Sequence, residues 1–326
     1  MSDQVLPWHS SLWESFKARA ECGKIPHAIL VSGPKDSGKL IFAKAITDYL
    51  LCEFKDGPCN DCKSCKLLLA GSHPDYRVIT SGDKQLKVDQ VRETIDWALK
   101  SSVLGGIKFC LFSPADSLNN QAQNALLKVL EEPPPKTFFC LVSGRPTSLL
   151  ATVKSRCQSI YMNPPTLDEA KSWLSSRNDG LEIELILKLS EQNPLKAHRR
   201  ITQDFLSERK NVANLIMAIL DGSSSPLSAA IQMDVTNPIA SFEIWYAILS
   251  DAIIIQQVGV DYIKSPDLIN TSKQLSSIFR LPILIEILEL IYTAISISYG
   301  TTNANSTKLI EQLCLSVSGV KKISSL

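Results

Sequence analysis

The chain has almost no net charge, no long apolar run and no internal repeat. Its 326 residues carry 34 Lys+Arg against 33 Asp+Glu, a formal net charge of +1. This balance excludes a protein that binds nucleic acid over its whole surface, although binding through a local basic patch remains open. No segment reaches the ~18 consecutive apolar residues that span a bilayer, so we expect no membrane association. The first twelve residues lack a basic stretch followed by an apolar one, and we therefore expect a cytoplasmic protein.

What the chain does have is enough apolar material for more than one core. At 44% hydrophobic and 21% charged residues, wholesale disorder is excluded. The length predicts two or three domains. Nine cysteines in a reducing compartment do not indicate a disulfide framework, so their spacing needs another explanation.

Strands and helices alternate in the first half of the sequence. Short apolar runs, typical of buried strands, lie at 27–32, 77–80, 108–113 and 137–143. Segments with helical spacing of apolar residues lie at 39–51, 88–99 and 120–130. Strands that are apolar along their whole length predict a parallel sheet covered by helices on both faces.

The pattern changes after two prolines near residue 165, and the rest of the chain is helical by period. Thr166 is followed three residues later by Glu169, which predicts a capped helix start. Further helices are predicted at 182–190, 207–220, 239–258, 281–298 and 307–317. We therefore expect an α/β domain over 1–165, a small helical lid over 166–206 and a helical collar over 207–326.

A glycine-rich segment, GPKDSGKL at 33–40, lies between the first strand and the first helix. Phosphate-binding loops need glycines for a tight turn, backbone N–H groups and a lysine, and Gly33, Gly38 and Lys39 supply them. The hydroxyl that holds Mg²⁺ in such loops is missing, because Leu40 stands in its place. The loop indicates descent from a nucleotide site that no longer works. We therefore do not expect the chain to depend on ATP as a cofactor.

The acidic half of such a site is also missing. A hydrolysing P-loop ATPase needs an Asp at the end of its third strand and commonly a Glu beside it. Here Ser113 and Pro114 follow that strand, and Asp116 lies further along, as a loop or helix-cap carboxylate. The loop thus lacks its hydroxyl, and the third strand lacks its carboxylates. These two independent losses favour a protein that has the architecture of an ATPase but does not hydrolyse ATP.

Four cysteines form the pattern C-x6-C-x2-C-x2-C, with turn-forming residues between them. Four thiolates at this spacing can close a tetrahedron around Zn²⁺ and leave no open coordination position, which makes the site structural rather than catalytic. The sequence therefore predicts a zinc module over 52–65, with these ligands: Cys52, Cys59, Cys62 and Cys65.

Ser155, Arg156 and Cys157 follow the fourth strand by about a dozen residues. An arginine beside a small polar residue is usually a surface charge. In a ring ATPase, however, an arginine after the last core strand reaches the γ-phosphate of a neighbouring subunit. Arg156 is thus a candidate arginine finger, flanked by Ser155 and Cys157.

Together these features resemble the delta-prime family of bacterial DNA polymerase III clamp-loader subunits, which belong to the AAA+ proteins. The resemblance is strong over about 7–165. It rests on the four-cysteine insert and on the following segments, in this order: 25–30 (IPHAIL), 72–76 (SHPDY), 88–92 (VDQVR), 124–134 (NALLKVLEEPP) and 155–157 (SRC).

The resemblance implies an AAA+ core, a lid and a collar that joins a hetero-pentamer with gamma/tau-type ATPase subunits and delta. It implies that this ring places the sliding clamp on primer–template DNA, as part of the DNA polymerase III holoenzyme. The lid arginine of the hydrolysing relatives is absent, because 193–196 reads NPLK. Gly38 and Lys39 are retained, so residual nucleotide binding stays open.

We therefore expect a subunit without ATPase activity of its own that donates Arg156 to a neighbouring ATPase. Two alternatives stay open at this point: an active ATPase subunit of the same assembly, and a stand-alone zinc protein that binds nucleic acid.

Overall fold

The structure is a computed structural model of the chain, which describes residues 5–54, 57–80, 86, 88–178, 182–234, 238–298 and 306–324. Residues 55 and 56 of the predicted zinc module lie outside the described residues. The chain divides into two compact units, Met1–Arg177 and Asn178–Leu326.

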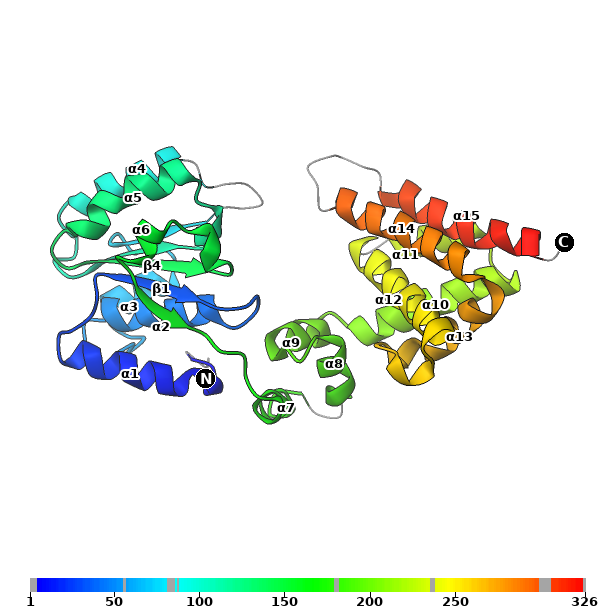
Figure 1. Cartoon of the computed structure of the whole chain (residues 1–326). Coiled ribbons are helices and arrows are strands. Elements are labelled where there is room, and N and C mark those ends of the chain that lie inside the picture. The colour runs from blue at the N-terminus through cyan, green and yellow to red at the C-terminus, as the bar shows by residue number, and fades with distance from the viewer. Residues whose placement is uncertain are drawn as a thin grey trace. The chain divides into compact units, whose positions relative to one another are not determined.

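The first unit is built on one parallel sheet of five strands in the order β2-β3-β4-β1-β5 (Figure 1). The predicted parallel sheet is confirmed. Four strands lie where the apolar runs indicated, and the fifth, β5, pairs with β1 and was not predicted. The bounds are β1 (Ala28–Ser32), β2 (Tyr76–Ile79), β3 (Lys108–Phe112), β4 (Thr137–Ser143) and β5 (Gln158–Tyr161).

Helices cover both faces of the sheet, as predicted. Successive strand residues point to opposite faces, so Leu30 and Leu141 join one core while Val31 and Val142 join the other. The first core is closed by α4 (Val88–Leu99), α5 (Asn120–Glu131) and α6 (Ala151–Lys154). The second is closed by α1 (Ser10–Glu21) and α2 (Lys39–Leu51), on the opposite side of the sheet in Figure 1.

The shorter elements of this unit are η1 (Pro7–His9), α3 (Lys63–Leu69), η2 (Ala115–Ser117), η3 (Pro146–Ser148) and α7 (Leu167–Ser175). The predicted helix start at Thr166 is confirmed as a capping box. The Thr166 side chain accepts a bond from the Glu169 N–H (3.3 Å), and the Glu169 carboxylate accepts one from the Thr166 N–H (2.8 Å). Two bonds therefore satisfy backbone donors that a helix start leaves open.

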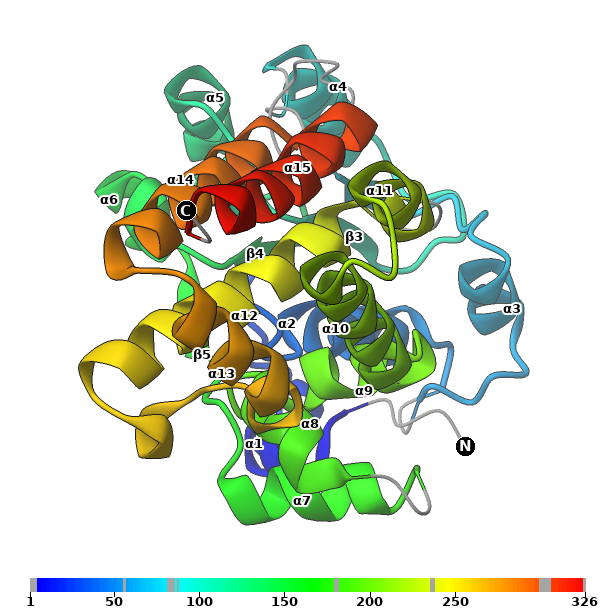
Figure 2. The same ribbon diagram turned by 90° about the vertical axis from the view of Figure 1, so that its right-hand side faces the viewer.

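The second unit is helical throughout its described residues, as expected, and Figure 2 shows α12 among its neighbours. One core holds α10 to α15 together. The bounds are α8 (Ile183–Leu189), α9 (Pro194–Thr202), α10 (Phe205–Asp221), α11 (Pro226–Asp234), α12 (Pro238–Gln257), η4 (Val260–Tyr262), η5 (Pro266–Leu268), α13 (Ile269–Ile278), α14 (Leu281–Ser298) and α15 (Ser306–Ser324).

One stretch of α12, Ile239–Gln257, is long and apolar enough to cross a membrane by length and composition. Phe242, Trp245 and Ile248 of this stretch are fully buried in the helical core. These contacts are those of a core helix, so the stretch is weak evidence for a membrane span.

The predicted lid, 166–206, is divided between the two units. Its helix α7 lies in the first unit, where Trp173 packs edge-on against Trp8 at 5.6 Å between ring centroids. Helices α8 and α9 lie in the second unit. The boundaries of the three predicted domains stay a prediction.

Candidate functional site

The glycine-rich loop lies between β1 and α2, the place where a phosphate loop belongs. Gly38 caps the helix with a φ of +88°, a conformation that favours glycine. A side chain at this position would collide with Leu6, and one at Gly33 would lie 2.6 Å from the Met162 carbonyl oxygen. The two glycines are therefore required by the packing of the resting loop.

The lysine of the loop is turned back onto the loop itself. The Lys39 ammonium donates to the carbonyl oxygens of Gly33 (3.0 Å) and Pro34 (2.5 Å). Burial lowers the pKa of Lys39, while the charges of Asp116 and Asp36 act to raise it. A phosphate at the loop would have to compete with these two carbonyls for the ammonium.

Asp116, which follows β3, connects the carboxyl ends of β3 and β4. Asp116 accepts hydrogen bonds from the Ser143 hydroxyl (2.5 Å), the Gly144 N–H (2.7 Å), the Arg145 N–H (3.2 Å) and the Ser148 hydroxyl (3.3 Å). Ser143 is the last residue of β4, and the other three donors follow it. The contacts are those of a structural loop carboxylate, and they leave little capacity for a metal ion.

The four cysteines of the predicted zinc module come together. Their sulfur atoms all lie within 4.8 Å of one another, and those of Cys59 and Cys65 are 4.0 Å apart. Zinc–sulfur bonds of ~2.3 Å in a tetrahedron place the sulfurs about 3.8 Å apart. The donor set and its spacing therefore fit a closed metal site, and the four cysteines could bind a metal ion.

The local chain folds so that backbone groups support these sulfurs. Cys62 is the N-cap of α3 and accepts the Cys65 N–H (3.3 Å), while Cys59 accepts the Cys62 N–H (3.3 Å). Such N–H groups, from Asp61 and Cys62, lower the pKa of Cys59 to about 7, whereas burial raises that of Cys65 to about 12. Buried thiols resist ionisation, which a bound cation would reverse.

A buried histidine ties the cysteine module to the sheet. The Asp75 N–H donates to His73 Nδ1 (3.1 Å), so Nε2 carries the proton and donates to the Ser64 hydroxyl (2.8 Å). Ser64 in turn donates to the Leu51 carbonyl. The Asp75 carboxylate accepts the N–H groups of Val103 and Leu104, both at 2.8 Å. The 72–76 segment, which carries part of the family resemblance, therefore fastens the module through His73, whose role is structural.

The candidate finger follows α6, which spans only four residues. Arg156 Nη1 donates to the Thr152 carbonyl (2.8 Å), and Nη2 forms an ion pair with Glu131 at the end of α5. The Arg156 side chain is 31% exposed. Beside it, the Ser155 hydroxyl donates to Thr152 (3.0 Å), and burial raises the pKa of Cys157 to about 11. Cys157 is thus a packing residue with an un-ionised thiol.

A buried glutamine, which the sequence did not single out, fixes α5 to the segment before α6. The Gln123 amide donates to the carbonyls of Leu118 (2.9 Å) and Ser148 (3.2 Å) and accepts the Leu150 N–H (2.6 Å). The Gln123 side chain lies on the apolar face of α5. Buried polar groups have hydrogen-bond partners, so a glutamine at a core position was the feature of the sequence that could have indicated this role.

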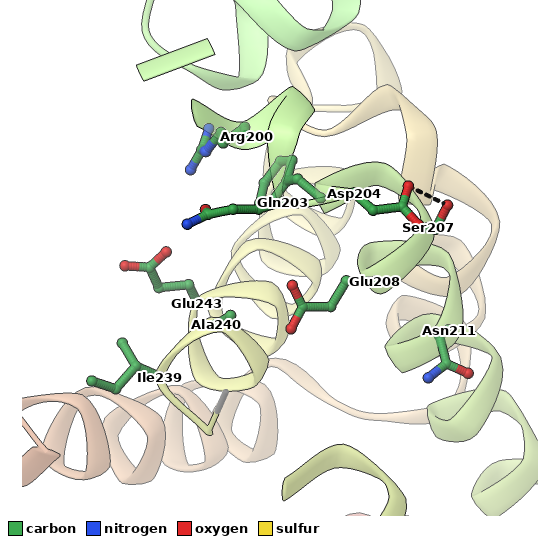
Figure 3. A pocket seen from close by; sticks show the side chains of 10 residues that line it. Arg200, Gln203, Asp204, Ser207, Glu208, Asn211, Ile239, Ala240 and Glu243 are labelled. Atoms are coloured by element: carbon green, nitrogen blue, oxygen red, sulfur yellow. Dashed lines mark hydrogen bonds between the residues drawn. The ribbon is translucent and has the colours of Figure 1, made fainter. Parts of the chain in front are cut away.

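A separate pocket of about 720 Å³ lies in the second unit, between α9, α10 and the start of α12 (Figure 3). Its lining mixes both signs of charge, and none of the residues predicted from the sequence to form a site lines it. Burial raises the pKa of Glu208 there and lowers that of Arg200. The Arg200 guanidinium lies over the Phe205 ring and donates to the Leu189 carbonyl, which is a structural role.

Comparisons with known proteins agree with this architecture. The family model described as DNA polymerase III, delta subunit, matches residues 8–166, and the model described as its C-terminal part matches residues 203–318. The DNA polymerase III subunit delta' of Pseudomonas aeruginosa is 36% identical over 233 residues, which cover 69% of this chain and 70% of that protein. The subunit delta' of Yersinia pestis is 32% identical over 292 residues, 86% of each chain.

A solved structure shares the fold. The crystal structure of a DNA polymerase III gamma-subunit-related protein of Thermotoga maritima aligns with a TM-score of 0.50 at 16% identity. The alignment covers 94% of this chain and 99% of that one. At this identity the likeness concerns the fold alone.

Proposed function

Because the chain belongs to the DNA polymerase III delta-prime subunit family, we propose that it works as a cytoplasmic subunit of the replicative clamp loader. Its partners are ATPase subunits of the gamma/tau type and delta, in a hetero-pentamer. The assembled ring places the sliding clamp on primer–template DNA. Membership of the family is the observation that carries this proposal.

Within the ring, the subunit does not hydrolyse ATP. Three features of the degenerate site support this: Leu40 has no hydroxyl for Mg²⁺, Lys39 is bonded to its own loop, and Asp116 is bonded to the end of β4 and the residues after it. Attraction of a phosphate to Lys39 in the ground state would not by itself accelerate hydrolysis. The same features argue against an active ATPase subunit.

The metal held by Cys52, Cys59, Cys62 and Cys65 is zinc, and its role is structural. Four sulfur ligands suit Zn²⁺ and leave no position for substrate. When bound, the ion supplies folding energy to a segment that has few apolar residues of its own.

Arg156 acts in trans on the ATP of a neighbouring subunit. A fixed guanidinium can stabilise the charge that develops during phosphoryl transfer, and such a finger contributes ~10³–10⁵ in rate. The support is local: the backbone of Arg156 is anchored by the buried Cys157, while its side chain stays partly exposed.

The test is a reconstituted clamp loader that contains Arg156→Ala or Arg156→Lys. DNA-stimulated ATP turnover should fall in part, because only one of several sites loses its finger. The two variants should behave alike, since an ammonium cannot reproduce the planar fork of arginine.

The matched control is Arg19→Ala, which removes an exposed arginine of α1 on the opposite face of the sheet. It should leave turnover unchanged. An Arg156→Ala complex that assembles, hydrolyses ATP and loads clamps like the parent would exclude the finger.

A further inference from the structure

We infer that Glu131 is a positioning residue, which holds the guanidinium of Arg156 in the orientation that meets a neighbour's nucleotide. This inference rests on the proposed role of Arg156 as a finger. It concerns a carboxylate that the sequence did not single out, at the last residue of α5.

Two elements hold the guanidinium from two sides. Glu131, on α5, forms the ion pair with Nη2, and the Thr152 carbonyl, on α6, accepts from Nη1 at 2.8 Å. A guanidinium has five N–H donors. The bonds it makes to described residues use Nη1 and Nη2 and leave Nε without a partner. Part of the fork therefore remains available to phosphate oxygens while the rest is fixed.

The two supporting elements are themselves fixed with respect to each other. Leu126 and Leu130 of α5 pack in the same buried core as Val153 of α6 and Cys157. The buried Gln123 adds three hydrogen bonds between α5 and the two segments beside it. A catalytic group that is held by such a frame needs no reordering when the phosphate arrives.

The position of Glu131 is unfavourable for the helix that carries it. The C-terminal end of a helix carries partial negative charge, which disfavours a carboxylate in its last turn. Arg156 offsets this cost by placing a positive charge on Glu131. Because both side chains are partly exposed, at 31% and 49%, the pair contributes little to stability. The benefit of the pair therefore lies in the orientation of the guanidinium.

The experiment compares complexes that contain Glu131→Ala, Glu131→Gln and the neighbouring control Glu132→Ala, which removes an exposed carboxylate of the same charge. Both kcat and KM of DNA-stimulated ATP turnover are measured. Glu131→Ala should remove most of the kcat that Arg156→Ala removes, about tenfold or more at the affected site, with KM unchanged. Glu131→Gln should restore part of it, because the amide oxygen still accepts a hydrogen bond, and Glu132→Ala should match the parent.

A double variant separates positioning from any independent role. Glu131→Ala combined with Arg156→Ala should be no worse than Arg156→Ala alone, since Glu131 acts only through the arginine. Parental or faster turnover with Glu131→Ala, or a defect that adds to that of Arg156→Ala, would overturn the inference. If Arg156→Ala is itself without effect, the finger and the role of Glu131 both fail. If only Glu131→Ala is without effect, the finger stands.

Discussion

Replacement of Asp116 by alanine should destabilise the first unit, because its carboxylate joins the segment after β3 to the end of β4 and the residues that follow it. The Ser143 hydroxyl lies in a fully buried residue, and Asp116 is its hydrogen-bond partner. A buried donor left without a partner costs about 1–3 kcal/mol. The donor groups of Gly144, Arg145 and Ser148 are exposed, so in the variant water can replace most of their hydrogen bonds to Asp116. We expect a loss of about 3 kcal/mol in the free energy of unfolding.

Tryptophan fluorescence can follow this loss, because four of the five tryptophans lie in Met1–Arg177 and only Trp245 lies in the second unit. For a unit of this size, about 3 kcal/mol lowers the melting temperature by roughly 6–12 °C. The control is Asp96→Ala, an exposed carboxylate of α4, which should change stability by less than about 0.5 kcal/mol. If Asp116→Ala melted like the parent but lost Mg²⁺-dependent nucleotide binding, Asp116 would be a metal ligand and the structural account would be wrong.

Three further predictions concern other parts of the first unit. Cys62→Ser should release zinc, as measured by elemental analysis, and loosen the cysteine module in hydrogen exchange, whereas the exposed Cys22→Ser should retain the metal. Lys39→Ala should leave clamp loading within about twofold of the parent, and the isolated chain should show no ATP turnover above background. Burial lowers the pKa of His73 from its ordinary value of 6.5, so the stability that the neutral ring contributes is complete above pH 6.5 and is lost as the pH falls below it. Urea midpoints at pH 7.5 and 5.5 should therefore differ less in His73→Gln than in the parent.

The sequence indicated those elements that have long, regular patterns. The helices expected at 39–51, 88–99 and 281–298 coincide with α2, α4 and α14, because each combines a clear apolar period with definite ends. The strand β5 was missed because it has only four residues and alternates between half-buried and exposed positions, as an edge strand does. Helix α3 was missed because it begins inside the cysteine pattern, which reads as a turn.

The candidate site was predictable where its chemistry is local in the sequence. The spacing of the four cysteines indicated their association, which the sulfur distances now bear out. The partners of Lys39, Asp116 and Arg156 were not predictable, because each contact depends on how the backbone folds around the side chain. Glu131 and Arg156 are 25 residues apart and meet only because α5 and α6 share a core.

Under the proposed function, these contacts also bear on how the ring is controlled. In an active ATPase subunit, the loop lysine and the acidic strand end change partners as nucleotide binds and leaves. Here the corresponding Lys39 and Asp116 are bonded within the chain, so a nucleotide would have to replace these bonds before it could engage either group. The guanidinium is instead held by α5 and α6, whose packing does not involve the loop. With Arg156 in the role proposed above, we therefore expect the ATP state of the neighbouring subunit, and not that of this chain, to switch the interface to which Arg156 contributes.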